Sequence, residues 1–338
     1  MVNESVTIIV VPRDRFSSVL ECTQSILEHT NTPFRLVFLD LGYPGATRMR
    51  LEELCRGRPC EIVPVGRKIP ITAFAEYLPR LATPYVAWVD NDTFATPGWL
   101  SALLERAREG ARVLLPVTLE REGLDVDRRR LPLRNHISHA ELRRVNVAGV
   151  SYVFDHKPYR RVAPEELPRD PHTVDFFELH AFFMETAVAR QLDWPPMVVR
   201  EHIDLGMQLH RLGIPIWCEP RSRVIFDNIH ERPTFADLRF FFYRWRQRFV
   251  DDSHALFEKR WGYRFYNEQF LSNWAFRRKV FSACRYAGLP HRAADFASRA
   301  FNKLLRPKVP GHLRPDPMPA SERVLEPLPA SLAGVESS

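Results

Sequence analysis

The first half of the chain alternates short apolar runs with amphipathic segments. The apolar runs predict strands at residues 6–11, 34–39, 61–65, 85–89 and 112–115. The amphipathic segments predict helices at residues 18–28, 48–54 and 72–81, and a further helix with Thr96 as its N-cap and Pro97 as its first residue. This alternation predicts an α/β fold, in which helices cover both faces of a mostly parallel sheet.

The second half of the chain is less regular. Residues 120–144 are charged and have no clear period, which predicts an irregular excursion. The apolar segment 176–184 is followed by a helix at 201–212, which Gly213 ends, and by two short strands at 214–218 and 223–226. Further helices are predicted at 235–257, 276–286 and 291–305, and the later residues, rich in Pro, Ser and Ala, predict disorder. We therefore expect an α/β domain at 1–232, a helical extension at 233–305 and a disordered tail at 306–338.

The strand at residues 85–89 ends in the acidic sequence Asp90-Asn91-Asp92. In open α/β sheets, ligands bind outside the carboxyl ends of the strands. Two carboxylates at such a place suit a hard divalent cation, which usually binds through one or two carboxylates together with substrate phosphates. The alternative is a pair of solvated acids at the start of a loop. The strand end and the helix that follows favour a metal site that serves a nucleotide diphosphate.

Three other segments contain candidate binding residues, each with a plainer alternative. Asp40 follows the second strand and can accept a hydrogen bond from a nucleobase or a ribose hydroxyl, or can cap the turn. Pro12 and Arg13 follow the first strand, where Arg13 can meet a phosphate or be solvated. His230 is a candidate further ligand for Mn²⁺, although a surface histidine is the commoner case.

The helix at 201–212 begins with three ionisable residues, Glu201, His202 and Asp204. Acidic side chains are favourable in the first turn of any helix because of the helix dipole. A carboxylate or an imidazole there can also take a proton from a hydroxyl nucleophile. Both interpretations remain open from the residues alone.

Composition and missing motifs exclude several classes of protein. The 338 residues are 45% hydrophobic and 26% charged, with a net charge of +7 that suits phosphate-bearing substrates or a solvated surface rich in Arg. No nucleic-acid-binding pattern occurs, so no nucleic acid is expected as a partner. The five scattered cysteines form no CxxC pair, and no segment approaches the roughly 20 apolar residues of a membrane helix, which favours a cytoplasmic protein. The chain lacks the GxGxxG, Walker A and GxSxG sequences, which argues against a dinucleotide-binding dehydrogenase, a P-loop enzyme and a hydrolase.

Four segments in this order resemble the family 2 glycosyltransferases, which are inverting enzymes of the GT-A fold. The resemblance covers about residues 6–230 and is carried by TIIVVPRDRFSSVLECTQSIL, FRLVFLDLGYPG, YVAWVDNDTFATPGWL and REHIDLGMQLHRLGIPIWCEPRSRV. The third segment is similar to the DxD strand of a bacterial subgroup that reads VDND followed by PGWL. The fourth is similar to the acceptor-side motif ExxDL.

The resemblance implies a role for each candidate residue. Pro12, Arg13 and Asp40 would border the nucleotide. Asp90, beside Asn91, would contact the ribose or a metal-bound water. Asp92 would ligate Mg²⁺ or Mn²⁺.

The same resemblance implies an enzyme that moves a sugar from a UDP-, GDP- or dTDP-linked donor to a hydroxyl acceptor. One of Glu201, His202 and Asp204 would deprotonate that acceptor, with Asp204 slightly preferred.

The sequence departs from the family pattern in two places. Many members have Glu-Asp where this chain has Glu201-His202, and many have an Arg-Asn pair where this chain has Phe74-Ala75. A nucleotide-sugar-binding or glycan-binding homologue with weak or no turnover is therefore an alternative. A nucleotidyltransferase is a further one, although the chain lacks its Gly-rich phosphate loop. Residues 238–249 (LRFFFYRWRQRF) either touch a membrane interface or pack on the domain.

Overall fold

A mixed β-sheet forms the centre of the molecule, in a computed structural model that describes residues 6–122, 131–227, 232–308, 320–326 and 328. Its strand order is β3-β2-β1-β4-β11-β6-β12-β10, with β5 paired to β12 and β7 paired to β6. The bounds are β1 Val6–Val11, β2 Phe34–Asp40, β3 Cys60–Pro64, β4 Tyr85–Asp90, β5 Thr93–Ala95, β6 Val113–Arg121, β7 Leu133–Ile137, β10 His172–Val174, β11 Ala181–Glu185 and β12 Ile216–Phe226.

Two parallel blocks make up most of this sheet. Strands β3, β2, β1 and β4 form one block, β6 and β12 form the other, and β11 joins them by pairing antiparallel with both β4 and β6. Every residue of β1 is buried, as expected for a parallel strand covered on both faces. The predicted α/β fold is confirmed, and the antiparallel β11 places residues from the second half of the chain next to β4.

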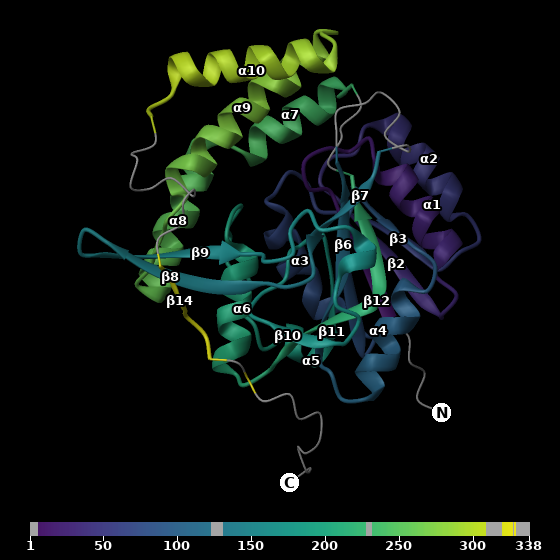
Figure 1. The fold of residues 1–338 in the computed structure, drawn as a ribbon. Helices are drawn as coiled ribbons and strands as arrows, with labels where there is room; N and C mark the ends of the chain where they lie inside the picture. The colour runs from purple at the N-terminus through teal and green to yellow at the C-terminus, as the bar shows by residue number, and fades with distance from the viewer. Residues whose placement is uncertain (1–5, 123–130, 228–231, 309–319, 327, 329–338) are drawn as a thin grey trace.

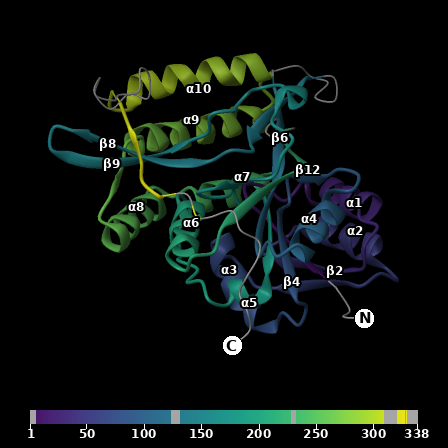
Figure 2. The ribbon, with the colours of Figure 1, turned by 60° about the horizontal axis from the view of Figure 1, so that its bottom comes forward.

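Helices cover both faces of the sheet (Figure 1). Helices α1, α2 and α4 lie on one side, while α3 and α6 lie on the other, as Figure 2 also shows. The bounds of these helices, with the short α5, are α1 Val19–His29, α2 Gly45–Cys55, α3 Pro70–Tyr77, α4 Trp99–Arg108, α5 Thr186–Ala189 and α6 Glu201–Arg211. Two 3₁₀ turns are at Leu78–Arg80 and Pro164–Glu166.

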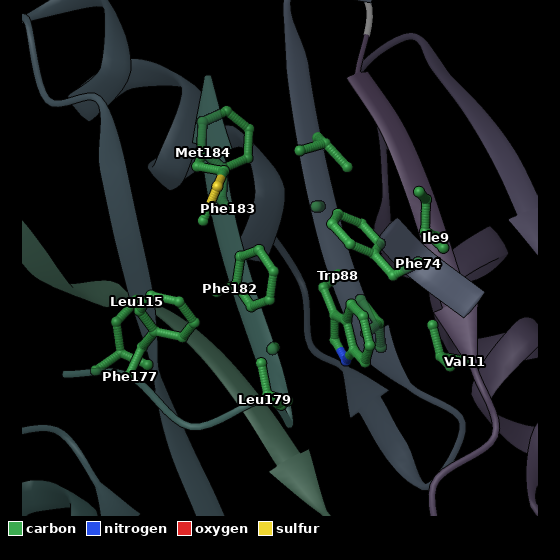
Figure 3. Close-up of a cluster of buried hydrophobic side chains, with 14 of the residues drawn as sticks. Ile9, Val11, Phe74, Trp88, Leu115, Phe177, Leu179, Phe182, Phe183 and Met184 are labelled. Carbon is green, nitrogen blue, oxygen red and sulfur yellow. The ribbon is translucent and has the colours of Figure 1, made fainter. Parts of the chain in front are cut away.

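Aromatic side chains fill the core between α3 and the centre of the sheet (Figure 3). The ring of Phe74 lies 5.0 Å from that of Trp88 on β4, and Trp88 stacks on Phe182 of β11 at 5.9 Å. All three side chains have no exposed surface. Each ring buries a large apolar area, so this cluster fixes α3 and β11 against the strand that carries the acidic sequence.

A second, small sheet and four helices complete the described fold. The sheet has the order β13-β9-β8-β14. Its strands are β8 Glu141–Val147, β9 Val150–His156, β13 Arg264–Phe265 and β14 Glu322–Arg323. The helices are α7 Phe235–Arg244, α8 Gln247–Trp261, α9 Glu268–Tyr286 and α10 His291–Leu305. In both ribbon views α9 and α10 form an outer layer at the top of the molecule (Figures 1 and 2).

Several local predictions were wrong, and in most cases partners distant in sequence explain why. Residues 133–137 and 141–147 form β7 and β8 because they pair with β6 and β9, although their sequence has no clear period. The two strands predicted at 214–218 and 223–226 are one bulged strand, β12. Helix α4 begins after Gly98, whose φ of 78° is left-handed, and the hydroxyl of Thr96 donates to the carbonyl of Arg223 instead of capping the helix.

The helical extension and the tail also differ from expectation. The predicted helix at 235–257 is broken at Trp245 and Arg246 into α7 and α8. Phe240, Phe241 and Trp245 are buried, so three of the six aromatic side chains of segment 238–249 pack inside the protein, while Phe242 is 41% exposed. In the tail that was predicted to be disordered, Glu322–Arg323 pairs antiparallel with β8.

Candidate functional site

Three neighbouring strands bring the candidate residues together at one edge of the sheet. In the parallel pair β1–β4, Val11 lies opposite Asp90, so Arg13 and the acidic sequence follow the same edge. Strand β11 runs in the opposite direction and begins beside the end of β4, with Ala181 opposite Val89. The preceding residue, His180, therefore lies next to Asp90, whose backbone N–H donates to the His180 carbonyl at 2.9 Å.

Asp90 is fully buried and contacts three polar groups. Its carboxylate accepts a hydrogen bond from the Trp88 indole at 2.9 Å and pairs with the Arg13 guanidinium at 3.2 Å. The Nδ1 atom of His180 lies 3.3 Å from the same carboxylate. Burial raises the pKa of Asp90 above its ordinary value, although the charge of Arg13 opposes that rise.

Asp92 is equally buried but has a less satisfied carboxylate. Its side chain is 1% exposed, and its Oδ1 atom has no hydrogen-bond partner among the described residues. Burial raises the pKa of Asp92, and the nearby charge of Asp90 raises it further. A buried carboxylate of this kind is costly unless a cation completes its surroundings.

Asp90, Asp92 and His180 together offer a metal-binding set. One donor atom from each lies within 4.8 Å of the other two. Two carboxylate oxygens and an imidazole nitrogen suit Mn²⁺, and the carboxylates also suit Mg²⁺. The unpaired oxygen of Asp92 is the observation that makes these residues fit a divalent cation.

The other residues predicted to bind the nucleotide hold the loops of the site in place. The Asn91 amide donates to the Arg15 carbonyl at 2.6 Å, and its oxygen accepts from the backbone N–H of Arg13 at 3.2 Å. Pro12, which directly follows β1, is buried. Asn91 thus ties the end of β1 to the end of β4.

Asp40 makes the contacts of a turn cap. Its Oδ1 atom accepts from the backbone N–H groups of Gly42 and Tyr43 at 2.8 and 2.7 Å, and its Oδ2 atom pairs with Arg48 at 3.2 Å. Gly42 has a φ of 117°, which the tight turn requires. A contact between Asp40 and a nucleobase stays a prediction.

The three ionisable residues at the start of α6 have different surroundings. Glu201 lines a small cavity with Arg13, Trp88 and Arg244, and its Oε2 atom has no hydrogen-bond partner among the described residues. The charge of Glu201 is one of those that raise the pKa of Arg13. Glu201 and Arg13 therefore line the same cavity, which also borders Trp88 on the strand that ends in the acidic sequence.

His202 and Asp204 lie in other environments. The His202 ring is buried 5.7 Å from the ring of Phe176, and burial lowers its pKa. Both oxygens of Asp204 are satisfied: they accept from Arg260 at 2.7 and 3.2 Å, from the Trp261 indole at 2.7 Å and from Gln208 at 2.6 Å. Asp204 thus holds α8 against α6.

His230 lies outside the described residues, but the end of the preceding strand reaches the site. The backbone N–H of Asp227 donates to the Asp92 carbonyl at 2.8 Å, and the Asp227 carboxylate pairs with Arg15 at 2.5 Å. The helical extension contributes Arg244, which pairs with Asp14 at 2.5 Å beside the same loop. The site is therefore supported from β1, β4, β11, β12 and α7.

Sequence reasoning missed His180 as a candidate ligand. A polar residue inside an otherwise apolar segment is informative, and His180 and Glu178 are the polar residues of segment 176–184. Glu178, His136 and His180 also place donor atoms within 4.8 Å of one another. In that second group the ammonium group of Lys157 pairs with Glu178, so the side chain of Lys157 already supplies the positive charge that a metal ion would supply.

Comparison with known proteins finds one family model and several solved structures that are similar to this chain. Residues 7–167 match the model of the protein family described as Glycosyl transferase family 2, a range that contains Arg13, Asp90 and Asp92. No curated protein matches the chain. The structure of GalNAc-T7 with UDP, GalNAc and Mn²⁺ is similar, with a TM-score of 0.50 at 11% identity over 84% of this chain and 58% of that one.

Two more solved structures are similar at a lower score. PcManGT from Pyrobaculum calidifontis, a mannosyltransferase in complex with GDP-Man and Mn²⁺, gives a TM-score of 0.48 at 14% identity over 89% of this chain and 87% of that one. Residues 1–349 of TarS from S. aureus, with UDP-GlcNAc, give 0.46 at 11% identity over 89% and 90%. The chain has the GT-A fold of glycosyltransferases, and it spans 58% of the length of the GalNAc-T7 chain.

Proposed function

We propose that the protein transfers a sugar from a nucleotide-sugar donor to a hydroxyl acceptor, with inversion at the anomeric carbon and with the help of Mg²⁺ or Mn²⁺. The observation that carries this proposal is the buried Asp92 oxygen that has no partner among the described residues and lies beside Asp90 and His180. Asp90 and Asp92 fall within residues 7–167, which match the glycosyltransferase family model. The GalNAc-T7 structure of similar fold contains UDP and Mn²⁺, and we propose a nucleoside diphosphate and a divalent cation for this chain too.

Asp92, Asp90 and His180 would hold the cation. A bound divalent cation neutralises the negative charge that develops on a departing nucleoside diphosphate. Asp90 also orients Arg13, because its carboxylate holds the Arg13 guanidinium at 3.2 Å. A guanidinium fixed in this way is a good partner for a phosphate oxygen.

We propose Glu201 as the general base, in place of the earlier preference for Asp204. Glu201 keeps an unpaired carboxylate oxygen in the cavity that Arg13 also lines. An unpaired carboxylate can take the proton of an acceptor hydroxyl as that hydroxyl attacks the anomeric carbon. The Asp204 oxygens are occupied by Arg260, Trp261 and Gln208, so proton transfer there would break a satisfied network. His202 remains the second candidate.

Product analysis tests turnover directly. Purified protein is incubated with Mn²⁺ and UDP-, GDP- or dTDP-linked sugars, with water as the acceptor of the glycosyl group, and the released nucleoside diphosphate and free sugar are measured by chromatography. We expect release with one nucleotide class and its loss in Asp92→Asn. The matched control is Asp175→Asn, a buried aspartate that pairs with Arg323 and does not belong to the metal-binding set. Equal activity in wild type and Asp92→Asn would overturn the proposal.

The donor base is tested separately by ligand-induced stabilisation. A ligand that binds only the native state raises the melting temperature as its saturation rises. Melting curves with UDP, GDP and dTDP in the presence of Mn²⁺ should show a shift for one of the three. If none stabilises the protein, the nucleotide site is contradicted.

A binding protein without turnover is the second candidate function. This alternative is motivated by the absence of the Arg-Asn pair that many family members have at residues 74 and 75. In this chain Phe74 is a fully buried core residue between Trp88 and Trp194. This alternative predicts nucleotide-sugar binding without release of product. Release of pyrophosphate from a nucleoside triphosphate would instead indicate a nucleotidyltransferase.

A further inference from the structure

Helix α10 is strongly amphipathic, but it turns small side chains toward the protein and large apolar side chains toward the solvent, whereas an ordinary surface helix does the reverse. Its two fully buried side chains are small, Ala294 and Ser298, which have no exposed surface. Its large apolar side chains are exposed, with Phe296 at 75% and Leu304 at 79%. A helix that is only a structural element turns its large apolar side chains inward.

Four apolar residues of α10, three of them exposed and Ala300 half-buried, form one continuous row, and the exposed Phe301 and Leu305 lie outside it. Ala293, Phe296, Ala300 and Leu304 follow one another at spacings of three and four, so they share a face of the helix. The small residues Ala294 and Ser298 lie on the neighbouring face, where they allow close packing against α9. Figures 1 and 2 show α10 at the outer edge of the molecule, with α9 between it and the rest of the protein. We call the row of four residues the α10 face.

Basic side chains border this face. Arg292, Arg299 and Lys303 lie at spacings of three, four or seven from Phe296, and therefore line its edge. Arg292 and Lys303 form no ion pair with any acidic side chain of the described residues. Residues 291–308 contain five Arg or Lys residues and one acid, Asp295, which pairs with Arg299.

We propose that the α10 face binds the surface of a membrane that contains anionic lipids. Exposed aromatic and aliphatic side chains next to basic ones are the features of a helix that lies in the plane of the lipid interface. At 15 residues α10 is about 22 Å long, enough to lie along an interface. Among the described helices, none is long and apolar enough to cross a bilayer. The charge pattern selects anionic lipid over a second copy of this chain, which would bring the same positive charges together.

This inference concerns another helix than the membrane contact that the sequence suggested for residues 238–249, where Phe240, Phe241 and Trp245 are buried. It is also independent of the proposed chemistry. Loss of sugar transfer in Asp92→Asn would leave vesicle binding unchanged, so the two proposals fail separately.

The test is flotation of the full-length protein with lipid vesicles. We expect the wild type to float with vesicles of equal parts phosphatidylcholine and phosphatidylglycerol, and to bind pure phosphatidylcholine at least ten-fold more weakly. The variant F296S/L304S should bind the anionic vesicles at least ten-fold more weakly than wild type. The matched control is Met49→Ser, which removes another apolar side chain, 66% exposed, from α2 on the sheet domain, and it should bind as wild type does.

The electrostatic contribution is tested by R292E/K303E, compared with R50E/R56E at the exposed end of α2. The first variant should lose binding and the second should keep it, and added salt should weaken the binding of the wild type. Circular dichroism confirms that each variant is folded. Salt and lipid dependence of the wild type test the proposal even if a variant does not fold.

The proposal is overturned if the wild type ignores anionic vesicles, or if F296S/L304S binds them as the wild type does. It is also overturned if sedimentation velocity shows a wild-type dimer that F296S/L304S dissociates while vesicle binding is absent. That result would assign the α10 face to contact between two copies.

Discussion

The acidic pair at the end of β4 and the single residue Asp204 in the first turn of α6 are all buried, but their surroundings are opposite. At the end of β4, Asp90 and Asp92 lie beside each other, and one Asp92 oxygen has no partner among the described residues. At the start of α6, Asp204 is just as buried, but both of its oxygens accept hydrogen bonds. A buried carboxylate stabilises a protein only when it is satisfied. Asp90 and Asp92 therefore have the properties of a binding site, whereas Asp204 has those of a structural joint.

Removing the charge of Asp92 should give the largest effect on activity. We expect Asp92→Asn to lower the rate of transfer by at least about 100-fold, because even partners that only support a metal ligand contribute about 10–100-fold. The same variant should be as stable as wild type without metal, or more stable, since burial raises the pKa of Asp92 and disfavours its charge. Steady-state kinetics and thermal unfolding in EDTA measure both effects. A large loss of stability would place Asp92 with Asp204 as a structural residue.

Glu201→Gln should affect activity next most strongly. General acid–base catalysis contributes about 100-fold or more, so kcat should fall by about that factor while KM for the donor changes little. An unchanged kcat would exclude Glu201 as the base and leave His202 as the candidate.

Asp204→Asn should show the reverse behaviour. It leaves Arg260 and Trp261 with weaker acceptors, which should lower the free energy of unfolding by about 1–3 kcal/mol. Below its melting temperature the variant should retain most of the wild-type activity per folded molecule. Denaturant unfolding and kinetics on the same samples separate the two effects, and a catalytic defect without destabilisation would contradict the structural assignment.

The smallest expected effect is a pH dependence of stability from His202. Burial lowers the pKa of His202 in the folded protein, so the unfolded chain binds a proton more readily. The stability that this residue contributes is therefore present above its unfolded pKa of about 6.5 and is lost as the pH falls below it. The stability of wild type relative to His202→Gln should fall on acidification. If the two proteins keep a constant difference between about pH 7 and about pH 5, His202 is not held neutral.

The parts of the fold that depend on local pattern could be predicted from the sequence. Strand β1 at Val6–Val11 and helix α10 at His291–Leu305 have the expected bounds, because the first is a short apolar run and the second is an amphipathic segment. The acidic end of β4 was located for the same reason. Strands β7 and β8 were missed, since only their pairing with β6 and β9 makes them strands.

The candidate site was predictable only in part. Asp90 and Asp92 follow one strand, whereas His180 reaches them through an antiparallel strand nearly ninety residues later. Asp204 looked like a catalytic residue because its partner Arg260 lies 56 positions further on, in another helix. Local sequence shows where charged residues lie along an element, but it does not show which of them are neutralised by distant partners.

Binding of Mn²⁺, measured by electron paramagnetic resonance, tests the central claim most directly. Wild type, Asp92→Asn and Asp204→Asn are titrated with Mn²⁺ in the presence of the nucleoside diphosphate that stabilises the protein most. We expect wild type and Asp204→Asn to bind the ion alike, and Asp92→Asn to bind it at least about ten-fold more weakly. Equal binding by Asp92→Asn and wild type, or a selective loss in Asp204→Asn, would contradict the assignment of the end of β4 as the metal site.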